Sequence, residues 1–201
     1  MITLEGGEGA GKTTQAHMLA DALVARGIDV LRTREPGGAP GAEVLRELLL
    51  HGPVSWSPPA ETLLHFAARA EHVERTIRPA LAAGQWVVCD RFFDSTMAYQ
   101  GFGQGADRGM IATLTKLLGV APDITFVLTV SPDVAAARLA GRSGRGDRYE
   151  ALGADFHARV ARGFRDIAIA DPGRCVLIDA DPAPEVVHAT IMRGLRPVIA
   201  G

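Results

Sequence analysis

A glycine-rich segment near the N-terminus places the strongest constraint on the fold of this chain. Residues 6–13 read GGEGAGKT, which fits the pattern G-x-x-x-x-G-K-[ST]. They lie between an apolar run at residues 2–4 and a segment with apolar residues at helical spacing over residues 16–23. The glycines let successive backbone N–H groups turn toward one anion, and the start of the following helix adds a partial positive charge. The motif therefore predicts a strand, a phosphate-binding loop and a helix, in that order.

We expect this loop to hold the phosphates of ATP. Lys12 would reach the β- and γ-phosphates, and the hydroxyl of Thr13 would join the shell of the Mg²⁺ ion bound with ATP. Of the 21 lysines and arginines only Lys12 and Lys116 are lysines, so a lysine inside this loop points to phosphate chemistry. The residues expected to bind ATP here are Gly6, Gly7, Glu8, Gly9, Ala10, Gly11, Lys12, Thr13 and Thr14.

The rest of the chain predicts an α/β fold built on a parallel sheet. Apolar runs alternate with stretches of helical periodicity, an order typical of βαβ units with helices on both faces of the sheet. Residues 86–89 and 125–128 are continuously apolar, as strands covered on both faces are. We expect a five-stranded parallel sheet in a single domain over residues 1–201. The expected strands are residues 1–5, 28–33, 85–90, 123–130 and 174–179, and the expected helices are residues 12–26, 58–83, 107–119, 151–170 and 183–195.

Composition and charge argue against several kinds of partner. The formal net charge of −2 in 201 residues does not indicate a surface for nucleic acid. The sequence contains neither a run of 18 apolar residues nor an export signal, so we expect a cytoplasmic protein without a membrane partner. Cys89 and Cys175 lie far apart in apolar runs and are expected to be buried free thiols.

Later segments indicate which kind of phosphate-loop protein this is. Asp90 ends an apolar run and is followed directly by Arg91, which pairs a carboxylate for a Mg²⁺ shell with a guanidinium for a phosphate. An N-K-x-D stretch, which reads guanine in switch GTPases, follows none of the later apolar runs. Asp179 also ends an apolar run, but it has no basic neighbour and is expected to be structural.

Arginines from several segments favour a kinase whose acceptor is itself a phosphate monoester. Such an acceptor is largely ionised at neutral pH and needs no general base, so the protein must align two polyanions and neutralise the charge that develops. Glycines at positions 141, 144 and 146 argue against a rigid helix, which favours a mobile lid at about residues 138–150 over a solvated turn. The candidate arginines are Arg34, Arg69, Arg91, Arg138, Arg142, Arg145 and Arg148.

Three further motifs resemble those of one family. Residues 33–38 read TREPGG, residues 66–72 read FAARAEH, and residues 90–101 fit D-R-[YFH]-x-x-S-x-x-A-Y-Q-G. In this order behind a phosphate loop, they resemble the thymidylate kinases along essentially the whole chain. The resemblance implies a P-loop kinase fold, ATP-dependent phosphorylation of dTMP to dTDP with Mg²⁺, and a homodimer.

The resemblance also assigns roles in binding dTMP. Phe66 would stack on the thymine ring, and Arg69 and Gln100 would hydrogen-bond the base edge. Cytosine inverts the donor and acceptor at positions 3 and 4, so these contacts would favour thymine. Tyr99 would lie against the sugar, where its ring would crowd a 2′-hydroxyl, and Arg91 would hold the acceptor phosphate. Further substrate contacts are expected from Arg34, from Ser95, and from Glu35 toward the sugar-phosphate or the waters of Mg²⁺.

The resemblance also indicates a branch of that family. One branch carries an arginine at the position of Gly9, whereas the branch typical of many bacteria lacks it and supplies the positive charge from its lid. With glycine at position 9, this sequence resembles the bacterial branch. Arg142 and residues 147–150, which read DRYE, resemble the bacterial lid, with an additional Gly-Arg that leaves open how Arg142 and Arg145 divide the work. The catalytic residues would then be Lys12, Arg91, Arg142 and Arg148. The adenine of ATP would lie between Arg138 and residues 179–182.

Other interpretations of the same residues stay open. Another nucleoside monophosphate kinase would use the same loop and arginines. A deoxynucleoside kinase acting on a hydroxyl would need a carboxylate base beside the acceptor, for which Glu35 is the candidate. A non-catalytic nucleotide-dependent switch would leave the arginine lid and residues 99–100 without a role. The histidines that match no functional position are His51, His65, His157 and His188.

Overall fold

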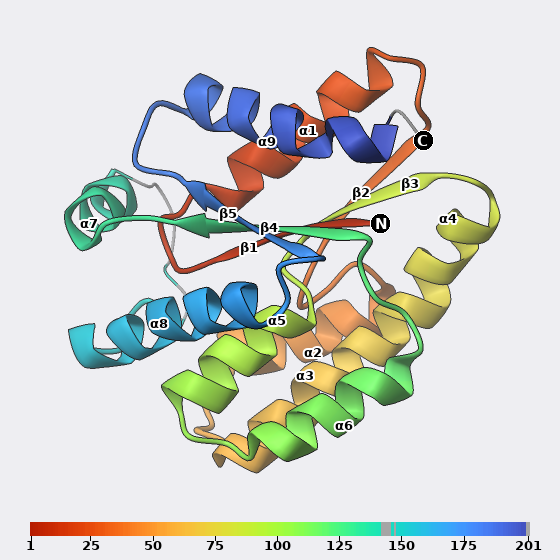
Figure 1. The fold of residues 1–201 in the computed structure, drawn as a ribbon. Helices are drawn as coiled ribbons and strands as arrows, with labels where there is room; N and C mark the ends of the chain where they lie inside the picture. The colour runs from red at the N-terminus through yellow and green to blue at the C-terminus, as the bar shows by residue number, and fades with distance from the viewer. Residues whose placement is uncertain (142–145, 147, 200–201) are drawn as a thin grey trace.

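The fold is built on a five-stranded parallel sheet, as the sequence predicted (Figure 1). The computed structural model describes residues 1–141, 146 and 148–199. Within this part of the chain the strand order is β2-β3-β1-β4-β5, and every neighbouring pair is parallel. The strand that leads into the phosphate loop is therefore central. The strands are β1 (Ile2–Gly6), β2 (Val30–Arg34), β3 (Trp86–Asp90), β4 (Ile124–Thr129) and β5 (Cys175–Asp179).

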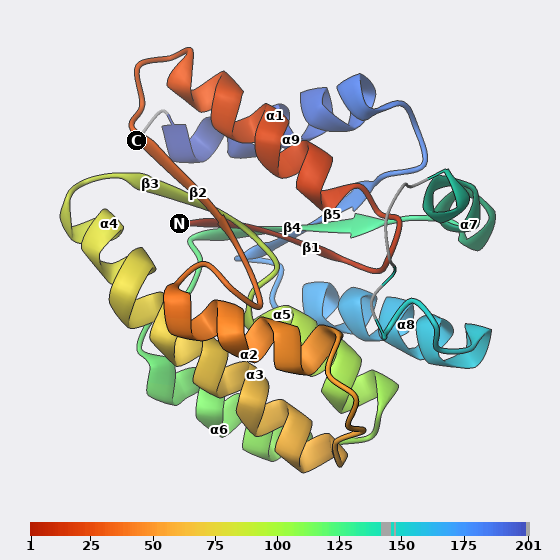
Figure 2. The ribbon, with the colours of Figure 1, turned by 180° about the vertical axis from the view of Figure 1, so that it is seen from behind.

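Helices cover both faces of this sheet. On one face lie α1 (Lys12–Val24) and α9 (Pro184–Ile199), which pack over a core that includes Leu4, Phe126 and Ile191 (Figures 1 and 2). A larger group of helices covers the other face of the sheet. Among them, α8 (Ala154–Ala170) packs against β4 and β5. The remaining helices on this face are α2 (Pro40–Leu50), α3 (Pro58–His72), α4 (Arg78–Ala82), α5 (Phe93–Thr96) and α6 (Arg108–Leu118).

Four helical regions differ from the sequence expectation. The sequence analysis assigned no helix to α2 and α7 (Pro132–Ala140), yet each has a proline in its first turn, where the missing N–H costs no hydrogen bond. Short α5 continues into a π-helical segment, η2 (Met97–Gly103). The long helix expected over residues 58–83 is interrupted by a second π-helical segment, η1 (Val73–Ile77). Arg138 therefore lies in a helix, although the lid was expected to begin there.

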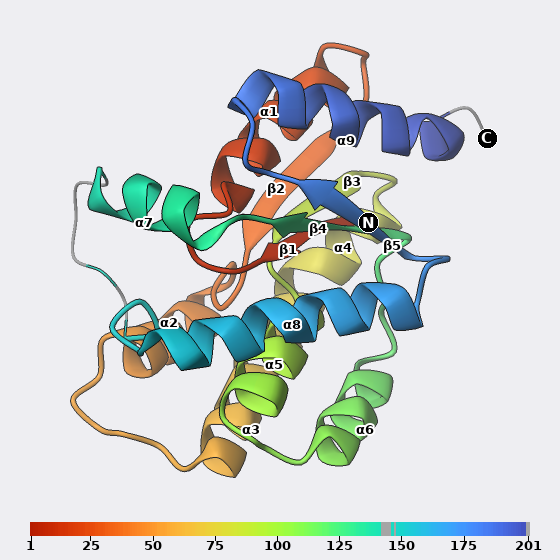
Figure 3. The same ribbon diagram turned by 60° about the vertical axis from the view of Figure 1, so that its left-hand side comes forward.

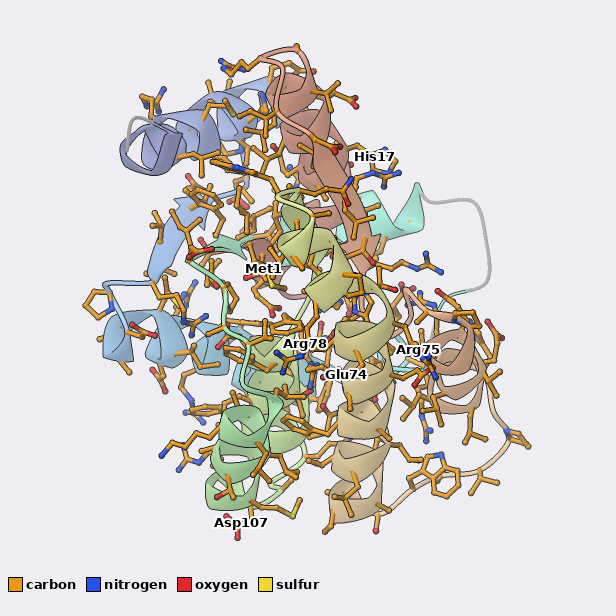
Figure 4. All side chains as sticks on the ribbon, turned by 90° about the vertical axis from the view of Figure 1, so that its right-hand side faces the viewer. Met1, His17, Glu74, Arg75, Arg78 and Asp107 are labelled. Carbon is orange, nitrogen blue, oxygen red and sulfur yellow. The ribbon has the colours of Figure 1, made fainter. Side chains whose placement is uncertain are left out.

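Helix α6 shows how closely a local signal can define an element. The carboxylate of Asp107 accepts hydrogen bonds from the backbone N–H groups of Gly109 at 2.7 Å and Met110 at 3.3 Å, which caps the helix (Figure 4). At the other end Gly119 adopts φ 63°, in the left-handed region that glycine enters without strain. The observed helix agrees with the expected residues 107–119.

The carboxyl ends of the five parallel strands lie along one edge of the sheet. The phosphate loop follows β1, Arg34 ends β2, Asp90 ends β3, and α7 follows β4 (Figure 3). Ligands of open α/β sheets bind at this edge. Within the described residues, no helix combines the length and apolar character needed to cross a membrane.

Candidate active site

A cavity of about 510 Å³ opens at the carboxyl edge of the sheet and brings most of the predicted residues together. Among the described residues, Gly6, Gly7, Phe66 and Arg148 do not line it, and the predicted Arg142 and Arg145 lie outside the described part of the chain. The predicted residues that line the cavity are Glu8, Gly9, Ala10, Gly11, Lys12, Thr13, Thr14, Arg34, Glu35, Arg69, Asp90, Arg91, Ser95, Tyr99, Gln100 and Arg138.

The phosphate loop needs glycine for both space and conformation. Gly9 has φ 72°, and a Cβ atom there would lie 2.8 Å from the carbonyl oxygen of Ala135 in α7. Lys12 is buried in the first turn of α1, and its Nζ donates to the carbonyl oxygen of Gly7 at 2.7 Å. Burial and the charge of Arg91 lower the pKa of Lys12 from 10.5 to about 8, although neighbouring carboxylates oppose this. The loop thus keeps a cation beside its backbone N–H groups.

Two oxygen groups suited to Mg²⁺ meet beside this lysine. The hydroxyl of Thr13 donates to the Oδ2 carboxylate oxygen of Asp90 at 2.5 Å, which joins α1 to the end of β3. Magnesium prefers oxygen ligands and usually completes its shell with water and substrate phosphates. The described residues contain no cluster of three or more His, Cys, Asp and Glu side chains that would hold a metal without such help. A hydroxyl and one carboxylate therefore fit Mg²⁺ that arrives with ATP.

Arg91 places a second cation in the cavity, after Lys12. Its φ of 69° is unusual for a residue with a side chain and turns the backbone sharply after β3. Nη2 donates to Glu8 at 2.6 Å and to the Tyr99 hydroxyl at 3.2 Å, while Nη1 donates to Ser95 at 3.2 Å. Burial tends to raise the pKa of Glu8, but the charges of Arg91 and Lys12 outweigh it and lower the pKa from 4.5 to about 2. The arginine is thus held in place by an ionised carboxylate.

A buried carboxylate at the end of β2 orients a second arginine. Glu35 accepts from Arg69 Nε at 2.6 Å through one oxygen and contacts His72 Nδ1 at 3.0 Å through the other. Arg69 Nη2 donates to the carbonyl oxygen of Phe92 and to Thr96, whereas Nη1 has no hydrogen-bond partner among the described residues. The sequence analysis expected Glu35 to face the sugar-phosphate or the waters of Mg²⁺, and in the structure its two oxygens contact Arg69 and His72. Nη1 of Arg69 is thus buried without a partner, although the residue lines the cavity.

Gln100 and Phe66 complete this end of the site in different ways. Gln100 lines the cavity, and its Nε2 donates to Glu61 at 2.9 Å and to the hydroxyl of Tyr149 at 3.1 Å. Phe66 packs with Ala106 and Ile111 in a buried cluster behind the cavity wall. The guanidinium of Arg69 lies 4.9 Å from the centre of its ring. The structure thus accounts for Phe66 by packing, and stacking on a base stays a prediction.

The arginines around the lid make different contacts. Arg138 in α7 donates to the carbonyl oxygen of Gly9 at 3.3 Å and to Ala180 at 2.8 Å, so it connects the phosphate loop to the loop after β5. Arg148 donates to carbonyl oxygens of Leu49 and Val54, and so contacts the end of α2 and the connection to α3. Its predicted approach to the transferred phosphoryl group therefore requires movement.

Arg34 lies at the rim of the cavity. Its Nη2 pairs with both carboxylate oxygens of Glu43 at 3.0 and 3.1 Å, and the Arg34 side chain is 53% exposed. A phosphate could therefore compete with Glu43 for this guanidinium at low cost, because exposed ion pairs are weak.

Several side chains of the site had no assigned side-chain role at the sequence level. Glu8 was assigned to the phosphate loop only through its position, yet its carboxylate binds Arg91 and Tyr99. His65 lines the cavity, and burial lowers its pKa from 6.5 to about 3, so it is neutral at physiological pH. Glu61 accepts from three side chains behind the cavity. Of these three side chains, only Glu8 could have been recognised from the sequence, because it is an acidic residue inside a phosphate loop.

A phosphate loop and a separate arginine site share one cavity at the carboxyl edge of a parallel sheet, which defines a P-loop kinase with a phosphorylated acceptor. Comparisons with known proteins agree with this class of protein. The sequence profile of thymidylate kinase matches residues 4–191. Thymidylate kinases of Gluconobacter oxydans and Caulobacter vibrioides are 53% and 51% identical, over 97% and 94% of this chain and 93% and 92% of theirs. The crystal structure of thymidylate kinase from Ehrlichia chaffeensis matches with a TM-score of 0.80 at 39% identity over 97% of both chains. The chain belongs to the thymidylate kinase family.

Proposed function

We propose that the cavity is the catalytic centre in which this chain, as a member of that family, phosphorylates dTMP to dTDP with ATP and Mg²⁺. One observation carries the assignment of the two substrates to their ends of the cavity. The phosphate loop and Arg91 share one cavity, and Arg91 donates to Gly6 and Glu8 of that loop, so a phosphate bound by Arg91 would lie next to a phosphate bound by the loop. The proposal treats residues 1–201 as one catalytic domain with a lid at about residues 138–150.

ATP is assigned to the phosphate loop. Lys12 would exchange its hydrogen bond with the carbonyl oxygen of Gly7 for one with a β- or γ-phosphate oxygen. Thr13 and Asp90 would hold Mg²⁺, which supplies neutralisation of the phosphate charge when it is bound. Arg138 and the loop after β5 would flank the adenine, since Arg138 already contacts that loop.

The phosphate of dTMP is assigned to Arg91. As a dianion it attacks the γ-phosphorus directly, so the residues here orient the nucleophile and take no proton from it. Tyr99 lies beside Arg91 in position to contact the sugar, and the free donor of Arg69 would bind a keto group of the base, with Gln100 nearby. The remaining proposed substrate contacts are those of Arg34, Phe66 and Ser95, whereas Glu35 would act on the substrate through Arg69, which it binds.

Two parts of the proposal concern the transfer step, namely the charge that develops on the phosphates and whether the acceptor needs a base. Arg142 and Arg148 would close over the reacting phosphates and supply the cation that Gly9 cannot. A hydroxyl acceptor would instead need Glu35 as a base, but both oxygens of Glu35 hold Arg69 and His72. This pairing favours a phosphate acceptor over a deoxynucleoside.

We further propose that the protein is a cytoplasmic homodimer. Large apolar side chains are exposed on three helices of one layer, namely Val44 on α2, Leu63 on α3 and Leu117 on α6. Their exposed fractions of 70%, 52% and 77% are consistent with a surface that a second copy would cover. Analytical ultracentrifugation of the purified chain tests this, and a monomer at micromolar concentration would reject it.

A coupled assay of ADP release against a panel of nucleosides and monophosphates tests the function. We expect kcat/KM to fall in the order dTMP, dUMP and UMP, with dCMP poor. The 2′-hydroxyl of UMP would press on Tyr99, and the 4-amino group of dCMP would face the donor of Arg69. Preference for dCMP, a ribonucleotide or an unphosphorylated nucleoside would reject the assignment to dTMP.

A further inference from the structure

A buried carboxylate, Glu61, lies directly behind the end of the cavity assigned to the base. It occupies the first turn of α3, and the residue is only 1% exposed. One oxygen, Oε1, accepts hydrogen bonds from Gln100 Nε2 at 2.9 Å, from Gln104 Nε2 at 2.7 Å and from the Tyr149 hydroxyl at 2.8 Å. Its other oxygen, Oε2, lies 3.9 Å from Nη1 of Arg148. Glu61 does not line the cavity, so any effect on a substrate must pass through one of these neighbours.

The carboxylate determines which way the amide of Gln100 points. An ionised carboxylate accepts hydrogen bonds and donates none, so it must face the amide nitrogen. A reversed amide would place its own oxygen about 3 Å from Glu61 Oε1, and two acceptors would then repel each other at a site removed from water. The amide oxygen of Gln100 is therefore turned away from Glu61. Among the described residues none donates to that oxygen, and Gln100 lines the cavity.

Arg69 supplies the complementary group. Its guanidinium is held by Glu35, Phe92 and Thr96, and the remaining nitrogen, Nη1, is a donor without a partner in the part of the chain described. Both residues line the cavity, so an acceptor from Gln100 and the buried, unpartnered Nη1 of Arg69 are the groups that a base entering there would meet. A pyrimidine with N3–H and a 4-keto oxygen matches this pair, whereas a pyrimidine with a bare N3 and a 4-amino group opposes it at both positions.

We infer that Glu61 is a positioning residue that makes the site selective for 4-keto over 4-amino pyrimidine nucleotides by holding the Gln100 amide with its oxygen toward the base. The inference rests on the proposed function, because it takes the substrate to be a pyrimidine monophosphate at this end of the cavity. It assigns the selectivity to a side chain that never touches the substrate.

Glu61→Gln tests the inference with two substrates that differ only at the edge being read. The amide of a glutamine at position 61 can donate as well as accept, so Gln100 is free to reverse. The ratio of kcat/KM for dTMP to that for 5-methyl-dCMP should fall at least about tenfold from the wild-type value. The selective part of the loss for dTMP should lie in KM, because phosphate alignment does not depend on the base edge. Glu61 also pairs with Arg148 at 3.9 Å, so a fall in kcat that is equal for the two substrates reports on Arg148 and leaves the ratio unchanged.

A swapped pair provides the matched rescue. In the double variant Glu61→Gln, Gln100→Glu the amide at position 61 donates to the carboxylate at position 100. That carboxylate presents an acceptor to the base in either orientation, and the buried groups and net charge are those of the wild type. The ratio should return to within about threefold of wild type, and circular dichroism shows that each variant is folded. This double variant also tests the inference if the single variant is unfolded.

Two results would overturn the inference. One is an equal loss of kcat/KM for both substrates in the single variant, or an unchanged ratio, since either means that Glu61 acts only on the fold. The other is a folded swapped variant without keto preference. Failure of the proposed function has a different signature, because the wild-type protein itself would then not phosphorylate dTMP.

Discussion

Replacing Glu35 by Gln should strongly destabilise the protein, although the side chain keeps its shape. Glu35 and Arg69 form an ion pair of 2.6 Å in which each side chain is only 3% exposed. The substitution leaves the guanidinium of Arg69 buried without its anion. The group at position 35 that contacts His72 Nδ1 also loses its negative charge. The carbonyl oxygen of Phe92 and the hydroxyl of Thr96 still accept from Arg69, so part of its hydrogen bonding remains.

The expected magnitude follows from burial. Removing one partner of a buried ion pair costs about 3–5 kcal/mol, and the remaining hydrogen bonds of Arg69 place this variant at about 3 kcal/mol. For a chain of this length each kcal/mol lowers Tm by about 2–4 °C, so Tm should fall by about 6–12 °C. Urea unfolding and thermal melting, both followed by circular dichroism without ligands, measure the two quantities.

Glu43→Gln is the matched control. Glu43 pairs with Arg34 at 3.0 Å with the same chemistry, but the side chains are 41% and 53% exposed. Solvent screening reduces such a pair to about 1 kcal/mol or less, so this variant should stay within about 4 °C of wild type. The reasoning fails if Glu35→Gln loses less than about 1 kcal/mol, or if both variants lose equally.

Three further outcomes concern the phosphate loop. The pKa of Lys12 is about 8 and thus below its usual value of 10.5, so its charge is present below that pH and lost as the pH rises through it. ATP should therefore bind about tenfold more weakly at pH 9 than at pH 7 by titration calorimetry, and an equal weakening in Lys12→Met would contradict the assignment. Lys12→Met itself should fold, as judged by circular dichroism, and turn over at less than about a tenth of the wild-type rate in the ADP-release assay. Gly9→Ala should lose about 1–3 kcal/mol in urea unfolding because its Cβ would meet Ala135, whereas Gly7→Ala, where no atom lies within 4 Å of the added Cβ, should lose less than about 1 kcal/mol. Equal losses would show that the contact with α7 is unimportant.

The sheet was predictable because its strands are short apolar runs between turn residues. Residues 85–90 were expected for β3 and residues 174–179 for β5, and the structure has Trp86–Asp90 and Cys175–Asp179. Helix α2 was missed because Pro40 and Gly41 form turns as readily as they begin helices. Helix α7 was missed because the glycines beyond its end led us to assign its one arginine, Arg138, to a lid without helical structure.

The site was predictable where a motif sits at a strand end, and not where its partner lies elsewhere in the chain. Asp90 ends β3 and Arg91 follows it directly, so their position near the phosphate loop could be inferred from topology. The carboxylate that holds Arg91 comes from 83 residues earlier, and the one that holds Arg69 from 34 residues earlier. Such pairs depend on tertiary packing, which spacing along the chain does not encode.

Because of the ion pair between Glu8 and Arg91, the proposed acceptor site already contains an internal counter-ion that an incoming anion must replace. With its pKa at about 2, Glu8 stays charged throughout the physiological pH range, so an incoming anion must compete with it for the guanidinium. A monovalent anion such as chloride replaces one charge by one and gains little. A phosphate monoester, whose second pKa is near 6, brings almost two charges at neutral pH and can displace the carboxylate. If Arg91 binds the acceptor phosphate as proposed, this ion pair would select phosphate monoesters over simple salts before any base or sugar is recognised.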